Sequence, residues 1–217
     1  SAEEINNPGL ILGTILAILG YQQKNKVTFI VSPEISGISS WLEQLLAEST
    51  GKKGKGFIPI EGEKMGPPEV YSSDRIFIYL RLIQTKQLKL DKAVEKIQKA
   101  GHPVIRIVVD DLYNLSQEFF RWEIAIAVAG SILQINPFNQ PDVEVSKFAT
   151  NKLVAQHKKT GLLPLENPIL CENGFGLFAT QQNRDFLCQM TGPSCSMVDL
   201  IRAHLNRLQS GDYFAIL

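Results

Sequence analysis

The sequence predicts an α/β protein in which a mainly parallel sheet carries helices on both faces, as in a three-layer αβα sandwich. Short β-branched runs alternate with helical stretches, which is the pattern of βαβ units. The run at 75–83 is apolar enough to be buried on both faces, as strands of parallel sheets are. At 217 residues, the chain is long enough for one well-buried domain.

The first half of the expected alternation starts with a helix over residues 9–22, where Pro8 occupies a position that needs no N–H donor. Residues 26–31 form a β-branched run of strand length that Ser-Pro ends. An apolar stripe then predicts a helix over 39–48. A short strand over 56–60 follows it.

The second half repeats the pattern. After the strand at 75–83, an amphipathic helix over 90–100 ends at Gly101, and a following proline bars its continuation. Residues 104–109 form a fourth strand, and 115–133 form a long, nearly all-apolar helix expected in the interior. Two more helices are expected, one from Pro141 and a polar one over 197–209.

Composition excludes several classes of partner. Lys plus Arg and Asp plus Glu number 22 each, so no charged field favours nucleic acid or an anionic membrane. The apolar stretches 9–20 and 119–133 fall short of the roughly 20 residues that a membrane span needs. The three cysteines form no CxxC pair and no zinc set, which predicts neither a metal nor a redox role. We therefore expect a cytoplasmic protein without metal or cofactor.

The position of a ligand in a parallel sheet follows a general rule, since ligands bind beyond the carboxyl ends of the strands. This rule indicates residues 32–34, which include Ser32, the loop after Ile60, and Asp110-Asp111. The rule places a site without naming a reaction.

Residues 174–179 read GxGxxA, which matches a dinucleotide-binding fingerprint. The motif comes late in the chain, without a clear βα unit after it. A turn next to a strand is the alternative. A nucleotide-dependent oxidoreductase would need this loop to open a helix at a strand end.

Two other stretches stand out. Glu48 ends an apolar helix just before a Gly- and Lys-rich loop, where its charge opposes the helix dipole. In the stretch 136–147, an Asn-Pro turn leads into a new helix that carries Lys147 one to two turns later. From composition alone, Glu48 could be a solvated terminal residue and Lys147 a surface lysine.

These two stretches, in this order, resemble phosphoglucose isomerases. Residues 47–56 are similar to that family's Glu-Ser-x-Gly-Lys signature, and 136–147 to its Asn-Pro-Phe-Asp-Gln-Pro-x-Val-Glu-x-x-Lys run. Asn139 departs from it, because the family commonly has Asp there. Residues 101–107 and 119–125 resemble the transaldolase-fused branch in particular. The resemblance covers nearly the whole chain and implies a sugar isomerase (SIS) domain with a flavodoxin-like fold.

The resemblance implies a role for each matching residue. Glu48 would be the general base that moves a proton between C1 and C2 of an open-chain sugar phosphate through a cis-enediol. Lys147 would assist ring opening or stabilise charge on oxygen, and Gln140 would bind substrate. Ser32 and His102 are further candidates for substrate contacts. His102 is also the nearest candidate for the ring-opening histidine, although it precedes a strand in a Gly-His-Pro turn.

The resemblance also implies that residues 1–217 are one carboxyl-terminal SIS domain from a longer enzyme. The family's phosphate cradle lies in a first SIS domain, which would be the partner of this one, alongside a homodimer contact. The sequence stops inside an apolar run at 212–217, which also predicts a fragment. We expect glucose-6-phosphate isomerase activity that the fragment alone lacks. A non-catalytic module that binds sugar phosphate is the competing hypothesis.

Overall fold

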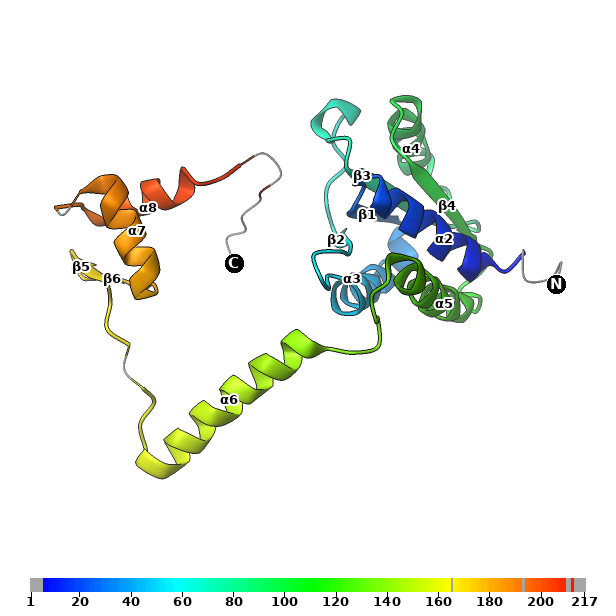
Figure 1. Ribbon diagram of the computed structural model, residues 1–217. Coiled ribbons are helices and arrows are strands. Elements are labelled where there is room, and N and C mark those ends of the chain that lie inside the picture. Colours follow the sequence, from blue (N-terminus) through cyan, green and yellow to red (C-terminus); the bar gives the residue numbers. More distant parts are fainter. Residues whose placement is uncertain (1–5, 165, 193, 210–211, 213–217) are drawn as a thin grey trace. The chain divides into compact units, whose positions relative to one another are not determined.

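The computed structural model describes residues 6–164, 166–192, 194–209 and 212 (Figure 1). The chain divides into two compact units, Ser1–Val145 and Ser146–Leu217, each with an apolar core of its own. The apolar run at 213–217 lies outside the described residues. The single SIS domain over 1–217 stays a prediction.

A fully parallel four-stranded sheet forms the centre of the first unit. In spatial order its strands are β2 (Ile58–Ile60), β1 (Lys26–Val31), β3 (Arg75–Leu82) and β4 (Val104–Val109). The strand order reverses direction between β1 and β3, as in doubly wound folds. β3 lies inside the sheet and is buried along most of its length, which confirms the expected burial on both faces.

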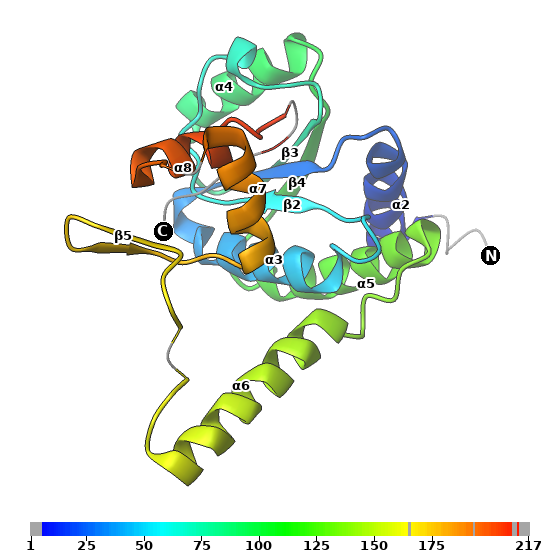
Figure 2. The ribbon, with the colours of Figure 1, turned by 60° about the vertical axis from the view of Figure 1, so that its left-hand side comes forward.

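Helices cover both faces of this sheet. They are α2 (Pro8–Tyr21), α3 (Gly37–Ser49), α4 (Leu88–Lys99) and α5 (Leu115–Leu133), with the short 3-10 helices η1 (Pro33–Ile35) and η2 (Pro68–Val70) in the loops. The larger core joins α2, α3 and α5 to one face, where β3 contributes Ile76 and Ile78. The smaller core joins α4 to the opposite face, where Phe77 and Tyr79 point. Figure 2 shows α4 and the pair α3 and α5 on opposite sides of the strands, and the three-layer α/β fold is thereby confirmed.

The long helix α5 differs from the expectation in one respect. Only one side of it is buried, including Trp122, whose ring meets that of Phe29 edge-on at 5.8 Å between centroids. Phe120 on the other side stays 66% exposed. The helix packs on the outside of the sheet, so its apolar composition does not make it a fully buried element.

The close packing of α2 against α5 depends on glycine. A Cβ atom at Gly13 would lie 2.3 Å from the carbonyl oxygen of Ala125. Only a residue without a side chain lets the two backbones approach so closely. The apolar helix at 9–22 was thus predicted correctly, and its Gly9 and Gly13 serve this contact.

The second unit is small. Helix α6 (Pro141–Thr160) begins in the first unit and continues into the second, and its side chains are exposed wherever they are described. An antiparallel hairpin of β5 (Leu170–Glu172) and β6 (Phe175–Leu177) follows, and then α7 (Gln181–Thr191) and α8 (Met197–Leu205). The buried core of this unit consists of Leu187, Leu200 and Ala203.

The hairpin corrects the oxidoreductase interpretation. Asn173 and Gly174 form its tight turn, both with positive φ (50° and 82°), as in the hairpin turns that favour Asn-Gly. Gly176 lies within β6, and the next helix begins only at Gln181. The loop therefore does not open a helix at a strand end, and the nucleotide-binding interpretation is wrong. The alternative, a turn beside a strand, is confirmed.

Within the described parts of the chain, none of the helices combines the length and apolar character needed to cross a bilayer. Among the same residues, no three His, Cys, Asp or Glu side chains gather into a group that could bind a metal ion.

A buried carboxylate lies in the first turn of α5. The side chain of Glu118 is 3% exposed and pairs with Arg121 at 3.2 Å. Its Oε2 atom, like Nε of Arg121 and Nε1 of Trp122, has no hydrogen-bond partner among the described residues. Burial raises the pKa of the Glu118 carboxyl, and the charge of Arg121 only partly offsets that rise.

This raised pKa makes stability depend on pH. The native state binds the Glu118 proton more tightly than the unfolded chain does, so the free energy of unfolding falls as pH rises through this titration. The loss is complete above the native pKa. We expect Glu118→Gln to remove this pH-dependent part of the free energy of unfolding, on the order of 1 kcal/mol, because a neutral amide carries no buried charge.

Urea unfolding from acidic to neutral pH measures the effect by tryptophan fluorescence, since both tryptophans, Trp41 and Trp122, lie in the first unit. Glu123→Gln is the matched control, because Glu123 is exposed on the same helix. Identical pH profiles for Glu118→Gln and the unsubstituted chain would rule out this source of pH dependence.

Candidate functional site

The carboxylate of Glu48 lies in the last turn of α3. The buried residues Leu42 and Leu46 fix this helix on the sheet and leave the Glu48 side chain exposed. Gln44, one turn earlier, donates from Nε2 to Oε1 of Glu48 at 3.0 Å. Gln140, which lies 92 positions further along the chain, donates from Nε2 to Oε2 at 3.0 Å. Each carboxylate oxygen thus accepts one amide N–H, and the two bonds together orient the carboxylate.

The Gly- and Lys-rich loop after Glu48 binds the end of α5 and the turn that follows it. Nζ of Lys52 donates to the carbonyl oxygen of Asn136, and Nζ of Lys55 donates to that of Leu133, both at 2.9 Å. Carbonyl groups at a helix C-terminus lack partners within the helix and carry partial negative charge, so ammonium groups stabilise them. These two lysines join the loop at 51–56 to the chain segment that leads to Gln140.

The segment between α5 and α6 turns sharply. Gln134 adopts a left-handed conformation (φ 59°) that ends the helix. The side chain of Asn136 then accepts a hydrogen bond from the amide of Phe138 at 2.9 Å, which is a local Asx turn. Pro137 packs against Gly130. A Cβ atom at Gly130 would lie only 2.8 Å from Cδ of Pro137. This turn brings Gln140 to Glu48.

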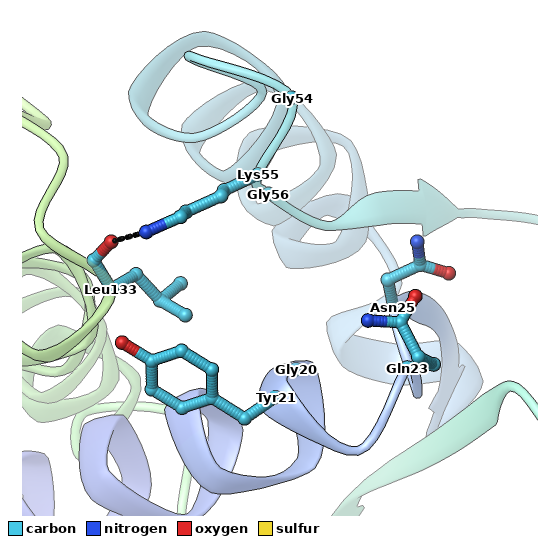
Figure 3. A pocket seen from close by; sticks show the side chains of 8 residues that line it. All are labelled: Gly20, Tyr21, Gln23, Asn25, Gly54, Lys55, Gly56 and Leu133. Carbon is cyan, nitrogen blue, oxygen red and sulfur yellow. Dashed lines mark hydrogen bonds between the residues drawn. The ribbon is translucent and has the colours of Figure 1, made fainter.

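A cavity of about 150 Å³ lies next to the same loop (Figure 3). Its lining residues are Gly20, Tyr21, Gln23, Asn25, Gly54, Lys55, Gly56 and Leu133. The hydroxyl group of Tyr21 donates to the carbonyl oxygen of Ile132 at 2.7 Å, so a third side chain binds the end of α5. Neither Glu48 nor Gln140 lines this cavity.

The site lies at an unexpected edge of the sheet. Because α3 connects the parallel strands β1 and β2, it runs back from their carboxyl ends, and Glu48 lies near their amino ends. The rule for parallel sheets indicated the opposite edge. The rule therefore does not predict the position of Glu48 and Gln140.

Ser32 does lie at the carboxyl edge, and the structure does not bring it to Glu48. Helix α3 has 13 residues, which separates its two ends by roughly 20 Å. The Ser32 side chain is fully buried, and its Oγ accepts a hydrogen bond from the amide of Leu82 at 3.0 Å. This bond ties the end of β1 to the end of β3.

His102 also lies apart from Glu48. It is half-buried on the α4 face of the sheet, where its ring meets those of Tyr71 and Phe77 edge-on. Its Nε2 is 3.3 Å from the carbonyl oxygen of Pro68. Glu48 belongs to a helix on the opposite face.

Lys147 is exposed on α6 in the second unit. It follows Gln140 by seven residues, about two helical turns. Its predicted neighbour Asp142 has a side chain outside the described part of the structure. The structure therefore pairs Glu48 with Gln140 and leaves the role of Lys147 a prediction.

Two contributions to the site were absent from the sequence-based prediction. Gln44 contacts Glu48 directly, and Lys52 and Lys55 hold the two motif stretches together. The contact between Gln44 and Glu48 could have been predicted from their spacing of four residues on one helix, because side chains at i and i+4 share a face.

No protein-family model matches this sequence. Glucose-6-phosphate isomerase of Mycoplasmopsis pulmonis is 27% identical over 172 residues, covering 61% of this chain and 40% of that protein. The enzyme of the same name from Parabacteroides distasonis is 26% identical, covering 58% of this chain and 37% of that protein. The one from Methanocaldococcus jannaschii is 23% identical, with coverages of 70% and 46%.

A solved structure supports the fold. A hypothetical protein of Thermus thermophilus superposes with a TM-score of 0.54 at 20% identity, covering 66% of this chain and 44% of that one. The regions matched in the three isomerases span 37–46% of their length. By its sequence, this chain is thus similar to glucose-6-phosphate isomerases of bacteria and archaea, over about two-fifths of their length.

Proposed function

We propose that this chain carries part of the active site of an aldose–ketose isomerase that interconverts glucose 6-phosphate and fructose 6-phosphate. The observation that carries the proposal is the contact between Glu48 and Gln140. These residues belong to the two stretches that resemble phosphoglucose isomerases, and they are far apart in sequence. The names of the relatives support the same reaction class.

In the proposed mechanism, Glu48 removes the proton from C2 of the open-chain aldose. Electrons of that C–H bond form the C1–C2 double bond, the carbonyl oxygen takes up a proton, and a cis-enediol results. Glu48 then returns a proton to C1 while the hydroxyl group on C2 loses its proton and becomes the ketone. One carboxylate serves both steps, because its conjugate acid is the donor in the second.

The amides around Glu48 have distinct parts in this proposal. Gln44 keeps Oε1 in place from within α3. Gln140 binds Oε2 and, from the same position, would hydrogen-bond a substrate hydroxyl group through its remaining amide atoms. Lys147 would stabilise negative charge on the substrate oxygens as a compact cation. Ser32 and His102 contact neither Glu48 nor Gln140 in the described hydrogen bonds, so they enter the proposal only as candidates for substrate contacts.

We further propose that a first SIS domain of the same polypeptide completes the site and binds the sugar phosphate. The limited coverage of the relatives supports this arrangement. The resemblance to the transaldolase-fused branch supports a fusion partner with transaldolase activity. Under this proposal, the 217 residues alone lack activity.

A coupled assay that follows glucose 6-phosphate formed from fructose 6-phosphate tests the proposal on the natural polypeptide that carries this sequence. We expect turnover from that polypeptide and none from the 217-residue chain by itself. A natural polypeptide that binds fructose 6-phosphate in calorimetry without converting it would contradict the isomerase and support the sugar-phosphate-binding module.

A further inference from the structure

Two of the three cysteines lie beside the small core of the second unit. Cys188 belongs to α7, and Cys195 precedes α8. Both are partly buried against the core of Leu187, Leu200 and Ala203. Cys171 on β5 is exposed instead. Two thiols therefore share one apolar environment, although their spacing matches no cysteine motif.

The chain path brings these two cysteines together. Helix α7 ends at Thr191, and Gly192, with φ 87°, reverses the chain. Helix α8 then starts at a fixed point, because Ser196 and Asp199 form a reciprocal capping box. Cys195 is thereby held beside the small core of Leu187, Leu200 and Ala203, against which Cys188 packs from α7.

The surroundings of Cys188 control its reactivity. Burial raises the pKa of the Cys188 thiol, and the neighbouring Cys195 thiol raises this pKa further. The guanidinium group of Arg184, one turn earlier on α7, acts in the opposite direction. Since the thiolate is the reactive form, oxidation should be slow at neutral pH and faster as pH rises.

We propose that Cys188 and Cys195 form a reversible intramolecular disulfide when the protein meets a low-molecular-weight disulfide such as oxidised glutathione. One thiolate attacks a sulfur atom of the reagent, breaks its S–S bond and releases one equivalent of glutathione. The second cysteine, as thiolate, attacks the protein sulfur of this mixed disulfide and releases the other equivalent. The two cysteines lose two electrons and two protons, and the reagent takes them up as two thiols.

The disulfide would stabilise the folded second unit. This unit has only three buried core residues among those described. Units of this size commonly depend on disulfides or metals, because they bury little apolar surface. A bond between Cys188 and Cys195 closes a short loop and ties α7 to the start of α8. Reduction would release the pair, so the stability of this unit would follow the thiol–disulfide balance around it.

The test uses Cys171→Ser in the 217-residue chain, because Cys171 is exposed and lies outside the core. After incubation with oxidised glutathione, we expect the intact mass to fall by two hydrogen atoms without any glutathione adduct. Both remaining cysteines should then resist alkylation until dithiothreitol is added. The rate should rise roughly tenfold per pH unit below the thiol pKa, as the thiolate fraction does.

Cys188→Ser and Cys195→Ser, each combined with Cys171→Ser, are the controls. Each should retain one glutathione on its remaining core cysteine, because no second thiol is present to displace it. Two separate glutathione adducts on Cys171→Ser, or two cysteines that stay open to alkylation, would overturn the proposal. Disulfide-linked dimers of Cys171→Ser would overturn it as well.

Discussion

Glu48→Gln should lower kcat for the isomerisation of fructose 6-phosphate by about 10²–10⁴-fold in the natural polypeptide, because a general base contributes a factor of that size. Gln has nearly the shape of Glu and can still hydrogen-bond Gln44 and Gln140. It cannot take up the proton from carbon. The KM should change little, since the substitution removes an interaction that matters mainly in the transition state.

Glu43→Gln is the matched control for this experiment. Glu43 is on the same helix and carries the same charge, and no described hydrogen bond or ion pair links it to Glu48. We expect its kinetics to stay within a small factor of the unsubstituted protein. Near-normal kcat in Glu48→Gln would show that Glu48 is not the base, even if the protein is an isomerase.

Gly56→Ala should be the most destabilising substitution in the loop after Glu48. A Cβ atom at Gly56 would lie 2.0 Å from the backbone nitrogen of Gly51, and φ of Gly56 is 147°. The clash is with backbone, so no rotamer change relieves it. The loop would have to open, which would also break the hydrogen bond from the Phe57 amide to Oγ1 of Thr50 at 3.0 Å. We expect the free energy of unfolding to fall by about 3 kcal/mol or more.

Gly54→Ala separates this clash from a general backbone effect. Gly54 also has a positive φ, 70°, but a Cβ atom there would meet no atom within 4 Å. Its cost should therefore be limited to about 1 kcal/mol, the penalty for a left-handed alanine. Urea unfolding followed by tryptophan fluorescence compares the two variants. Equal losses of stability would contradict the steric argument.

Much of the fold could be predicted from the sequence, because the apolar pattern and the turn residues agree locally. The strand at 104–109 and the helix at 115–133 have the predicted bounds, and α4 differs from its prediction by one or two residues at each end. The helix α7 was not predicted. Its polar composition carries little periodic signal, and its start depends on a cap at Thr180.

The site was predictable only in part. The resemblance indicated Glu48 and Gln140 as site residues. The hydrogen bond between them is a tertiary contact between distant parts of the chain, which no local sequence pattern predicts. The lysines of the loop at 51–56 illustrate the difference. Lys55 binds a carbonyl group in the last turn of α5 and Lys52 binds one in the turn that follows, contacts that only the folded chain creates. The packing of both Cys188 and Cys195 against one small core likewise depends on the turn at Gly192.

The most direct test of the central claim is hydrogen isotope incorporation during turnover in D₂O. The exposed carboxylate of Glu48 exchanges its proton with solvent, so glucose 6-phosphate formed from fructose 6-phosphate should carry deuterium at C2. In Glu48→Gln, the rate of incorporation should fall by the same factor as kcat. Incorporation at an unchanged rate in Glu48→Gln would contradict proton transfer by this residue.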